Sequence, residues 1–543
     1  MNKNKRLCTL AAILAVVIFA SAVTVFANSG EDLIPNIVEK DGRHALLVDG
    51  KPFLILGGQA HNSSAWPGML PTVWQAIDAL HANTLEVPIY WEQIEAQPGK
   101  FDFSLIDTLL VHARQRNVRL VLLWFATWKN GSNHYMPEWM KKQAVKYPNI
   151  TGKDGNPVDS PSPHTRAAME LDTQAFVKVM EYLKKADRQH TVIMVQVENE
   201  PGSWGSVRDF SPVAEKLIAG PVPPELLKPE ILKELNRPVN SKGTWRQVFG
   251  DDADEYFQAW SIAGYIGYVA AAGKAVNPLP LFTNASLRDP LTNPPATTYE
   301  SGGPTDNVLA IWKAAAPVLD LLAPDIYLRG CESVLKVIDL YARPDNALFV
   351  PEIGIGAENA RYFYSVLAKS GIGFSPFGID DNGRGETVQE TVTRLGAVGQ
   401  EYAMVTPMMR EMAQWAFDGK IHAVMECEDH APQSIDLGAW KAIVSFRASR
   451  RGPDANQDRP LGKAMIVKLG ESEFLLMGTF CHFTFEPQGA NAGKAWQYLQ
   501  VEEGAYDNGV FKRLRIRNGD ETDWGGPSIG PVPAVLHTTL TVR

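Results

Sequence analysis

The stretch Thr191-Val-Ile-Met-Val-Gln-Val-Glu-Asn-Glu-Pro-Gly202 decides the predicted fold, because an apolar run ends abruptly in Glu198, Asn199 and Glu200. Core strands rarely end in carboxylates for packing reasons, since an unpaired buried carboxylate is costly or has its pKa raised. A second apolar run, Ala347-Leu-Phe-Val-Pro-Glu352, also ends in a glutamate. Two strands that each end in a carboxylate suggest an acid/base and nucleophile pair, for which Glu200 and Glu352 are the candidates.

Apolar runs that alternate with helical patterns extend in both directions from this stretch. The candidate strands are residues 53–58, 84–90, 119–125, 191–197, 279–283, 319–326, 348–352 and 373–378. Most are continuously apolar, as expected of parallel strands that helices cover on both faces. Eight such strands predict a (β/α)8 barrel, a fold whose active site lies at the C-terminal ends of the strands. Glu200 then follows the fourth strand and Glu352 ends the seventh.

Residues 1–27 resemble a secretory signal. Lys3, Lys5 and Arg6 precede an uncharged run of 21 residues that ends in Val-Phe-Ala27, and small residues of this kind precede cleavage sites. We therefore expect an exported protein, periplasmic or extracellular, and an uncleaved N-terminal membrane anchor is the alternative. Cleavage would change the net charge from −9 to −12. So acidic a protein is a poor candidate for binding nucleic acid.

The mature chain is predicted to have two domains. Residues 28–420 would form the catalytic barrel, and residues 421–543, with short strand-like pieces between Gly and Asn turns, a smaller β-sandwich-like domain. Asp49-Gly50 predicts the turn of an N-terminal hairpin. Six prolines within residues 203–254 predict a substrate-side loop insertion. Residues 391–417 are predicted to form one long helix that closes the barrel.

The cysteines and the usual cofactor motifs suggest no bound group. Cys331, Cys427 and Cys481 have no Cys-x-x-Cys spacing, so neither a disulfide framework nor a structural zinc site is predicted, although one disulfide is compatible with them. The polar cluster between His422 and His430 is interpreted as a charged linker. A phosphate loop, a serine elbow and a dinucleotide fingerprint are all missing from the sequence. We predict no cofactor and no metal.

Hydrolysis of a glycosidic bond fits two such glutamates. A retaining glycosidase needs an acid that protonates the leaving oxygen and a carboxylate about 5 Å away that attacks the anomeric carbon. Asn199 is placed to bind the sugar 2-hydroxyl, and Tyr327 to donate a hydrogen bond to the nucleophile.

Three segments resemble a known enzyme family. Gln196-Val-Glu-Asn-Glu-Pro-Gly202 is similar to the strand-four signature of clan A glycoside hydrolases, specifically the β-galactosidases of glycoside hydrolase family 35. Asn83-Thr-Leu-Glu-Val-Pro-Ile-Tyr-Trp91 and Pro98-Gly-Lys-Phe-Asp-Phe103 resemble that family's second strand and following turn. The resemblance implies a retaining, exo-acting enzyme that releases terminal β-linked galactose from oligosaccharides or polysaccharide side chains. It implies Glu200 as acid/base, Glu352 as nucleophile, and Asn199, Tyr90 and Tyr327 as sugar contacts.

Tryptophans near the predicted strand ends are candidates for stacking against sugar rings. They are Trp66, Trp91, Trp124, Trp128, Trp139 and Trp204. The apolar C–H faces of a sugar pack well on indole rings, although core filling also accounts for tryptophans. We predict that Trp128 and Trp204 line the pocket, since both lie where a strand passes into a loop.

The chain also departs from the family pattern. Pro201 stands where the family has tyrosine, Thr127 replaces a galactose-binding glutamate, and the first strand matches only loosely around His61. These differences indicate a divergent branch. A β-galactosidase like those of family 42, or another β-glycosidase of the clan, is the nearest alternative. A carbohydrate-binding barrel without catalytic activity is the alternative from another class, and such a protein would have no need of the two glutamates.

Overall fold

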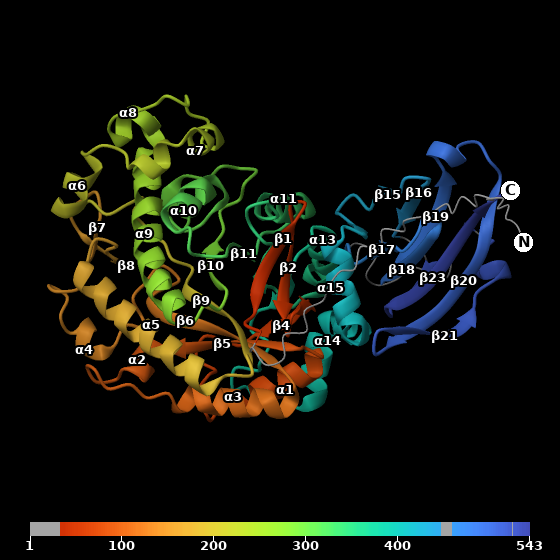
Figure 1. Ribbon diagram of the computed structural model, residues 1–543, viewed down its shortest axis with the longest axis horizontal. Coiled ribbons are helices and arrows are strands. Elements are labelled where there is room, and N and C mark those ends of the chain that lie inside the picture. The colour runs from red at the N-terminus through yellow and green to blue at the C-terminus, as the bar shows by residue number, and fades with distance from the viewer. Residues whose placement is uncertain (1–32, 447–458, 524) are drawn as a thin grey trace, which may run out of the picture.

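A computed structural model describes residues 33–446, 459–523 and 525–543, so the predicted signal peptide, residues 1–27, lies outside the described residues. A helix-covered barrel occupies the left of Figure 1, and antiparallel sheets from the C-terminal part occupy the right. Within the described ranges, no helix combines the length and the apolar character that a membrane span requires.

The eight predicted strands form a closed parallel barrel, which confirms the predicted fold class. The barrel strands are β4 (Ile55–Gln59), β5 (Thr84–Tyr90), β6 (Arg119–Lys129), β9 (Val192–Asn199), β10 (Leu281–Ser286), β11 (Leu321–Ile326), β12 (Phe349–Ile353) and β13 (Gly373–Pro376). The barrel closes where β13 pairs with β4. Almost every residue of these strands is buried, because side chains fill the barrel on one face and helices cover the other.

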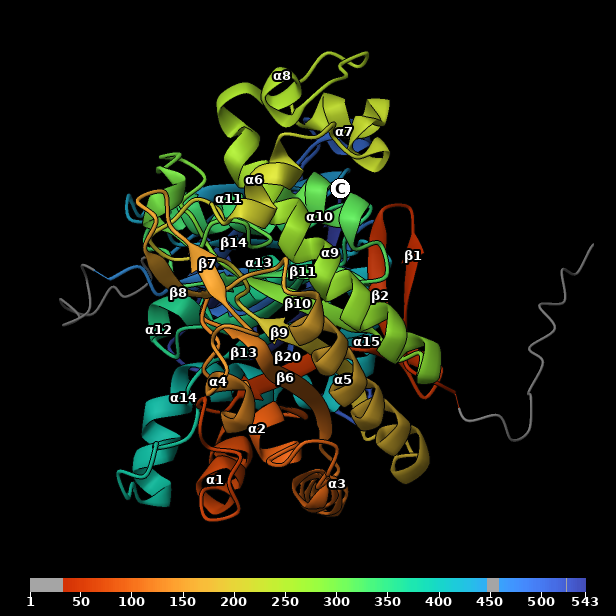
Figure 2. The same cartoon turned by 90° about the vertical axis from the view of Figure 1, so that its left-hand side faces the viewer.

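Helices surround the barrel, as Figure 2 shows from its end. They are α1 (Leu70–Leu80), α2 (Trp91–Ile94), α3 (Ser104–Arg116), α4 (Glu138–Lys141), α5 (Arg166–Ala186), α9 (Ala253–Val276), α10 (Leu309–Ala315), α11 (Cys331–Tyr341), α12 (Ala357–Ala360) and α13 (Tyr362–Ala368). Neighbouring helices pack together around the ring, for example α5 against α9 and α1 against α14 (Val388–Val405).

Two additions to the barrel agree with the predictions. The N-terminal sheet, β1 (Asn36–Lys40), β2 (Arg43–Val48) and β3 (Lys51–Phe53), turns at Asp49 and Gly50, both with positive φ. The proline-rich insertion contains only short helices, α6 (Pro212–Ile218), α7 (Pro229–Glu234) and α8 (Trp245–Phe249), which gather at the top of Figure 2. A small hairpin, β7 (Asn149–Thr151) with β8 (Pro157–Pro161), precedes α5.

The predicted single helix over residues 391–417 is wrong. The segment contains α14, a 3-10 turn over Thr406–Met408, and α15 (Met409–Phe417). Pro407 lies in that turn. A proline cannot donate the backbone hydrogen bond of a helix interior and clashes with the preceding turn, so the helix is interrupted there.

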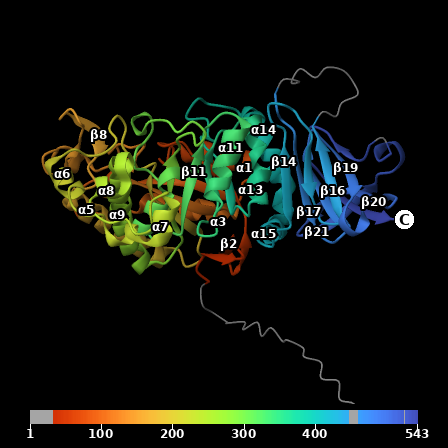
Figure 3. The same cartoon turned by 90° about the horizontal axis from the view of Figure 1, so that it is seen from above.

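The C-terminal part consists of two antiparallel sheets (Figure 3). The first sheet contains β14 (Ile421–Met425), β17 (Lys463–Lys468), β18 (Glu473–Thr479), β23 (Ala534–Val542), β20 (Trp496–Asp507) and β21 (Val510–Ile516). The second contains β15 (Gln433–Asp436), β16 (Trp440–Ser445), β19 (Cys481–Pro487) and β22 (Ser528–Ile529). Buried residues of both sheets form a common core.

Strands β17 and β18 of the six-stranded sheet are buried on both faces. In β17, Met465 and Val467 belong to the core of the barrel, whereas Ala464 and Ile466 face the other sheet. Successive side chains of a strand point to opposite faces, so this sheet joins the barrel to the outer sheet. A buried ion pair, Lys463 Nζ to Glu401 at 2.9 Å, adds a polar link between the sheet and α14. One face of this sheet therefore belongs to the core of the barrel, and its other face belongs to a separate core between the two C-terminal sheets.

A disulfide that was compatible with the sequence but not predicted also joins the two parts. It connects Cys331, at the start of α11, with Cys427, just after β14. The remaining cysteine of the described residues, Cys481, is free and buried.

Removing this disulfide is expected to destabilise the protein by about 2–4 kcal/mol, because the bond closes a long loop in the unfolded chain. Cysteines 331 and 427 are 96 positions apart. We expect the double variant Cys331→Ser/Cys427→Ser to melt about 2–4 °C below the wild type in calorimetry at one scan rate. Dithiothreitol should lower the wild-type midpoint and leave that of the variant unchanged. Equal midpoints for wild type and variant would contradict a stabilising role.

Candidate active site

Glu200 and Glu352 meet at the C-terminal mouth of the barrel. Glu200 directly follows β9, and Glu352 lies on β12, across the barrel from it. One carboxylate oxygen from each of Glu200, Asp325 and Glu352 lies within 4.8 Å of the other two. Both glutamates are about 95% buried, with 5% and 4% of their surface exposed. The structure thus brings together two carboxyl groups that lie 152 positions apart in the chain.

Glu352 is held by donors from four strands or strand ends. Its Oε1 accepts hydrogen bonds from Gln59 Nε2 at 2.9 Å, Asn199 Nδ2 at 3.2 Å and Asn284 Nδ2 at 3.5 Å. Its Oε2 accepts one from the Tyr327 hydroxyl at 3.0 Å. Such donors offset the charge of a carboxylate and fix its direction, which a nucleophile requires.

Glu200 has a different environment. Burial raises its pKa to about 7, and the nearby Glu352 carboxylate adds to the effect. Its backbone N–H donates to Asn284 Oδ1 at 2.9 Å, and the Asn130 amide donates to its Oε2. Glu198 and Glu200 both have positive φ, of 63° and 44°. Non-glycine residues rarely adopt this conformation, and the strand end is therefore strained in a way typical of functional sites.

Two further carboxyl groups and one lysine complete the cluster. Burial, with Glu352 and Glu200 nearby, raises the pKa of Asp325 well above its ordinary value. Burial and the proximity of Glu200 do the same for the pKa of Glu300. Lys129 is also buried, and its charge opposes these upward shifts in both pKa values. Protons and one ammonium group thus compensate the charge of the cluster.

The triad of Glu200, Asp325 and Glu352 is also the only group of acidic, histidine or cysteine side chains in the described ranges close enough to share a metal ion. Acidic side chains alone do not define a metal site, and Asn284 already donates to Asp325 Oδ2 at 2.5 Å. We assign no metal to this cluster.

The other predicted sugar contacts divide into two groups. Tyr327 and Trp204 are about half exposed, at 51% and 45%, and Trp204 Nε1 donates to Glu300 Oε1 at 2.5 Å. Tyr90 and Trp128 are fully buried. The Tyr90 hydroxyl accepts the backbone N–H of Ala65 at 3.2 Å. Both rings are therefore closed off from solvent in this structure.

The carboxyl group of Glu198 lies in a buried network with Asp172 and the backbone of Trp128. Its Oε2 accepts the backbone N–H of Trp128 at 2.6 Å, and burial together with Asp172 raises its pKa well above the ordinary value. Asp172 accepts hydrogen bonds from Thr127 Oγ1 at 2.6 Å and Trp124 Nε1 at 2.9 Å. Thr127 thus belongs to this buried network, through Asp172.

Several site residues were missed by the sequence prediction. They are Gln59, Lys129, Asn130, Asn284, Glu300 and Asp325. Gln59, Asn284 and Asp325 are polar residues at the ends of apolar strands, so the reasoning that found Glu200 and Glu352 could have found them. Glu300 lies in a loop and had no such signal. The cluster between His422 and His430 instead has structural partners: Glu426 accepts the N–H groups of Leu461 and Gly462.

Comparison with known proteins finds three kinds of similarity: to a family model, to curated sequences and to solved structures. The family described as a domain of unknown function (DUF5597) matches residues 398–526. A beta-galactosidase from Xanthomonas manihotis is 29% identical over 163 residues, which cover 29% of this chain and 25% of that protein. Beta-galactosidase 11 from Arabidopsis thaliana is 27% identical over 163 residues, covering 29% of this chain and 18% of that protein.

This chain thus spans about a quarter or less of the length of these curated relatives. Part of it is similar in sequence to beta-galactosidases. Among solved structures, the crystal structure of a beta-galactosidase from Bacillus circulans sp. alkalophilus aligns with a TM-score of 0.47 at 14% identity, covering 65% of this chain and 56% of that one.

Proposed function

We propose that this protein is a retaining, exo-acting glycoside hydrolase, most specifically a β-galactosidase that releases terminal β-linked galactose from oligosaccharides or polysaccharide side chains. The observation that carries the proposal is the pair Glu200 and Glu352, whose carboxylate oxygens lie within 4.8 Å at the barrel mouth. Retaining glycosidases have carboxyl groups about 5 Å apart, whereas inverting ones leave a wider gap for water. The partial sequence similarity to beta-galactosidases supports the choice of sugar.

The two environments suggest complementary roles. In the first step, Glu352 attacks the anomeric carbon and forms a glycosyl ester, while Glu200 donates its proton to the departing glycosidic oxygen. In the second step, Glu200 removes a proton from water, the water oxygen attacks the same carbon, and Glu352 leaves as a carboxylate. Asn199 lies beside the nucleophile, where it can also bind the sugar 2-hydroxyl.

A panel of nitrophenyl glycosides that differ at single hydroxyl groups tests the sugar, and NMR of the first-released sugar tests the stereochemistry. We expect the β-galactoside to be the best substrate and β-galactose to appear first. Initial release of the α-anomer would reject the retaining mechanism. A protein that binds these glycosides and cleaves none would be a carbohydrate-binding barrel instead.

Export of the mature protein is a further part of the proposal, since residues 1–27 resemble a secretory signal. N-terminal sequencing of the mature protein would find a start near Asn28 if the signal is cleaved. A mature chain that retains the apolar run would favour a membrane anchor.

The pH dependence should reflect Glu200. An acid catalyst works only when protonated, and the pKa of Glu200 is raised to about 7. We expect kcat/KM for methyl β-galactoside to level off about one pH unit below 7, to be halved near pH 7, and to fall about tenfold per pH unit well above it. A profile that stays level to pH 9 would contradict Glu200 as the acid.

Lys129 should set the position of this alkaline limb. Its positive charge lowers the pKa of Glu200, so its removal should raise that pKa. We expect Lys129→Met to move the alkaline limb to higher pH. The exposed Lys142, which pairs with Glu138 at the surface, provides the control variant Lys142→Met, expected to have the wild-type profile. A limb that stays in place in Lys129→Met would refute this electrostatic role.

A further inference from the structure

A pocket lies in the C-terminal sheets. Its lining comes mostly from β20 and β21, which lie at the end of the molecule away from the barrel in Figure 1. Its volume is about 520 Å³, within the range typical of small-molecule sites. The start of β20, the end of β21 and the loop that follows form most of the lining. The barrel mouth contributes none of the lining residues, so this pocket is distinct from the candidate active site.

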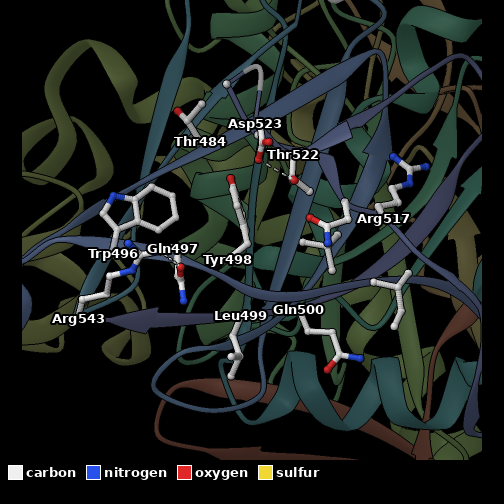
Figure 4. A pocket seen from close by; sticks show the side chains of 15 residues that line it. Thr484, Trp496, Gln497, Tyr498, Leu499, Gln500, Arg517, Thr522, Asp523 and Arg543 are labelled. Carbon is white, nitrogen blue, oxygen red and sulfur yellow. Dashed lines mark hydrogen bonds between the residues drawn. The ribbon is translucent and has the colours of Figure 1, made fainter. Parts of the chain in front are cut away.

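Two aromatic side chains form adjoining walls of the pocket. Trp496 and Tyr498 occupy alternate positions of β20, and Figure 4 shows both beside the same space, with Thr484 and Asp523 above them. Their ring centroids are 5.3 Å apart and the ring planes differ by 71°. The buried Trp440 meets Trp496 edge to face at 5.7 Å and holds it in place. Neither wall is fully buried.

The polar atoms of these walls have unused hydrogen-bonding capacity. Among the described residues, no hydrogen bond involves the Trp496 indole N–H or the Tyr498 hydroxyl, and burial raises the pKa of Tyr498, which keeps it a donor. Arg517 is already paired, because its Nε donates to Glu503 Oε2 at 2.9 Å and its guanidinium to the Ser528 carbonyl at 2.7 Å. Arg543 and Asp523 also line the pocket and carry opposite charges. Among the described residues, the pocket therefore offers aromatic faces, donors without a hydrogen-bond partner, and no excess of either charge.

This combination matches an uncharged sugar. The C–H face of a sugar ring packs on an aromatic face, and its hydroxyl oxygens accept hydrogen bonds from neighbouring donors. Two aromatic rings at a steep angle can contact a single sugar ring from two sides. Coplanar aromatic rings would instead suit a flat, extended polysaccharide chain.

We propose that the pocket bounded by Trp496 and Tyr498 binds a neutral sugar residue of the polysaccharide that the barrel trims. The choice of ligand rests on the proposed glycosidase function. Binding there would tether the polymer and raise its effective concentration at the distant barrel mouth without any new contact to the reacting bond.

Hydrogen exchange with mass spectrometry on the full-length Glu352→Gln variant tests the proposal, since this variant should not degrade the probes. The probes are soluble β-1,4-galactan, arabinogalactan and galactomannan, with polygalacturonate as an anionic comparison. We expect at least one neutral polymer to protect peptides covering residues 496–501 and 516–518, and polygalacturonate to leave them unprotected. Absence of protection there with every neutral probe, or protection by polygalacturonate alone, would overturn the proposal.

Variants localise the effect. Trp496→Ala should weaken binding tenfold or more. Tyr498→Phe, which keeps the ring and its packing, should weaken it about three- to tenfold through the lost hydroxyl. The control Leu514→Ala changes an exposed residue of β21 outside the lining and should have no effect. Protection that persists unchanged in both Trp496→Ala and Tyr498→Phe would exclude this pocket.

Activity separates this proposal from the proposed function. In the catalytically intact chain, Trp496→Ala should raise KM for the polymer and leave turnover of nitrophenyl β-galactoside unchanged. If the wild type cleaves neither substrate while residues 496–501 are protected, the hydrolase proposal fails and the binding site stands. If it cleaves both and those residues are never protected, the binding site fails alone.

Discussion

Replacing Glu352 with alanine or glutamine is expected to lower kcat by about 10⁴-fold or more, because the variant has no group that can form the glycosyl ester. Glutamine keeps the shape of the side chain, but it sets an amide near three amide donors, those of Gln59, Asn199 and Asn284. Alanine leaves a space. Both variants should fold, since the native carboxylate lies at the mouth and its neighbours remain polar.

Azide distinguishes a lost nucleophile from general damage. In Glu352→Ala, azide should enter the vacated space, restore turnover of dinitrophenyl β-galactoside and give the α-galactosyl azide, the product of one inversion. Glu138→Gln, at an exposed surface position, is the matched control and should keep wild-type activity. Rescue that gives the β-azide, or near-normal activity of Glu352→Ala without azide, would remove Glu352 from the nucleophile role.

Replacing Glu200 with alanine should have the second-largest effect, and its size should depend on the leaving group. Methyl β-galactoside needs a proton on its departing oxygen, so we expect kcat/KM to fall about 10²- to 10⁴-fold. Dinitrophenolate leaves without help, so formation of the glycosyl ester from that substrate should be nearly unchanged. The alkaline limb near pH 7 should disappear, because the group that produces it is gone.

Azide again provides a sharp comparison. With Glu200→Ala, azide should intercept the glycosyl ester on Glu352 and give the β-galactosyl azide, opposite in configuration to the product expected from Glu352→Ala. Equal losses for activated and unactivated substrates would contradict the acid role of Glu200.

Much of the barrel could be predicted because its strands have a strong local signal. Continuous apolar runs at eight positions gave the strands nearly at their observed bounds. Glu200 and Glu352 could be predicted because each is a carboxylate at the end of such an apolar run. Closure of the barrel, and not any local pattern, brings Asn284 and Asp325 against them, so their contacts with the pair were not predicted.

Other features depend on partners far away in the sequence. The disulfide links cysteines 96 positions apart, and no spacing rule pairs them. The sheet between barrel and outer sheet has apolar residues on both faces, which blurs the alternation that marks a half-buried strand. Burial of Tyr90 and Trp128 also depends on neighbouring loops, because an aromatic residue at a strand end can either stack on a ligand or fill the core. Pro407, by contrast, is a local signal in the sequence, and it was sufficient to predict that the helix is interrupted there.

Trapping of the covalent intermediate tests the central claim most directly. A 2-deoxy-2-fluoro-β-galactoside with a dinitrophenyl leaving group should form the glycosyl ester and break it down slowly, since fluorine disfavours the oxocarbenium-like transition states and the activated leaving group favours the first step. We expect the intact mass to rise by one fluorogalactosyl unit, with the adduct on the peptide that contains Glu352. An adduct on another residue, or steady hydrolysis of ordinary galactosides by a protein that never accumulates an adduct, would contradict the account.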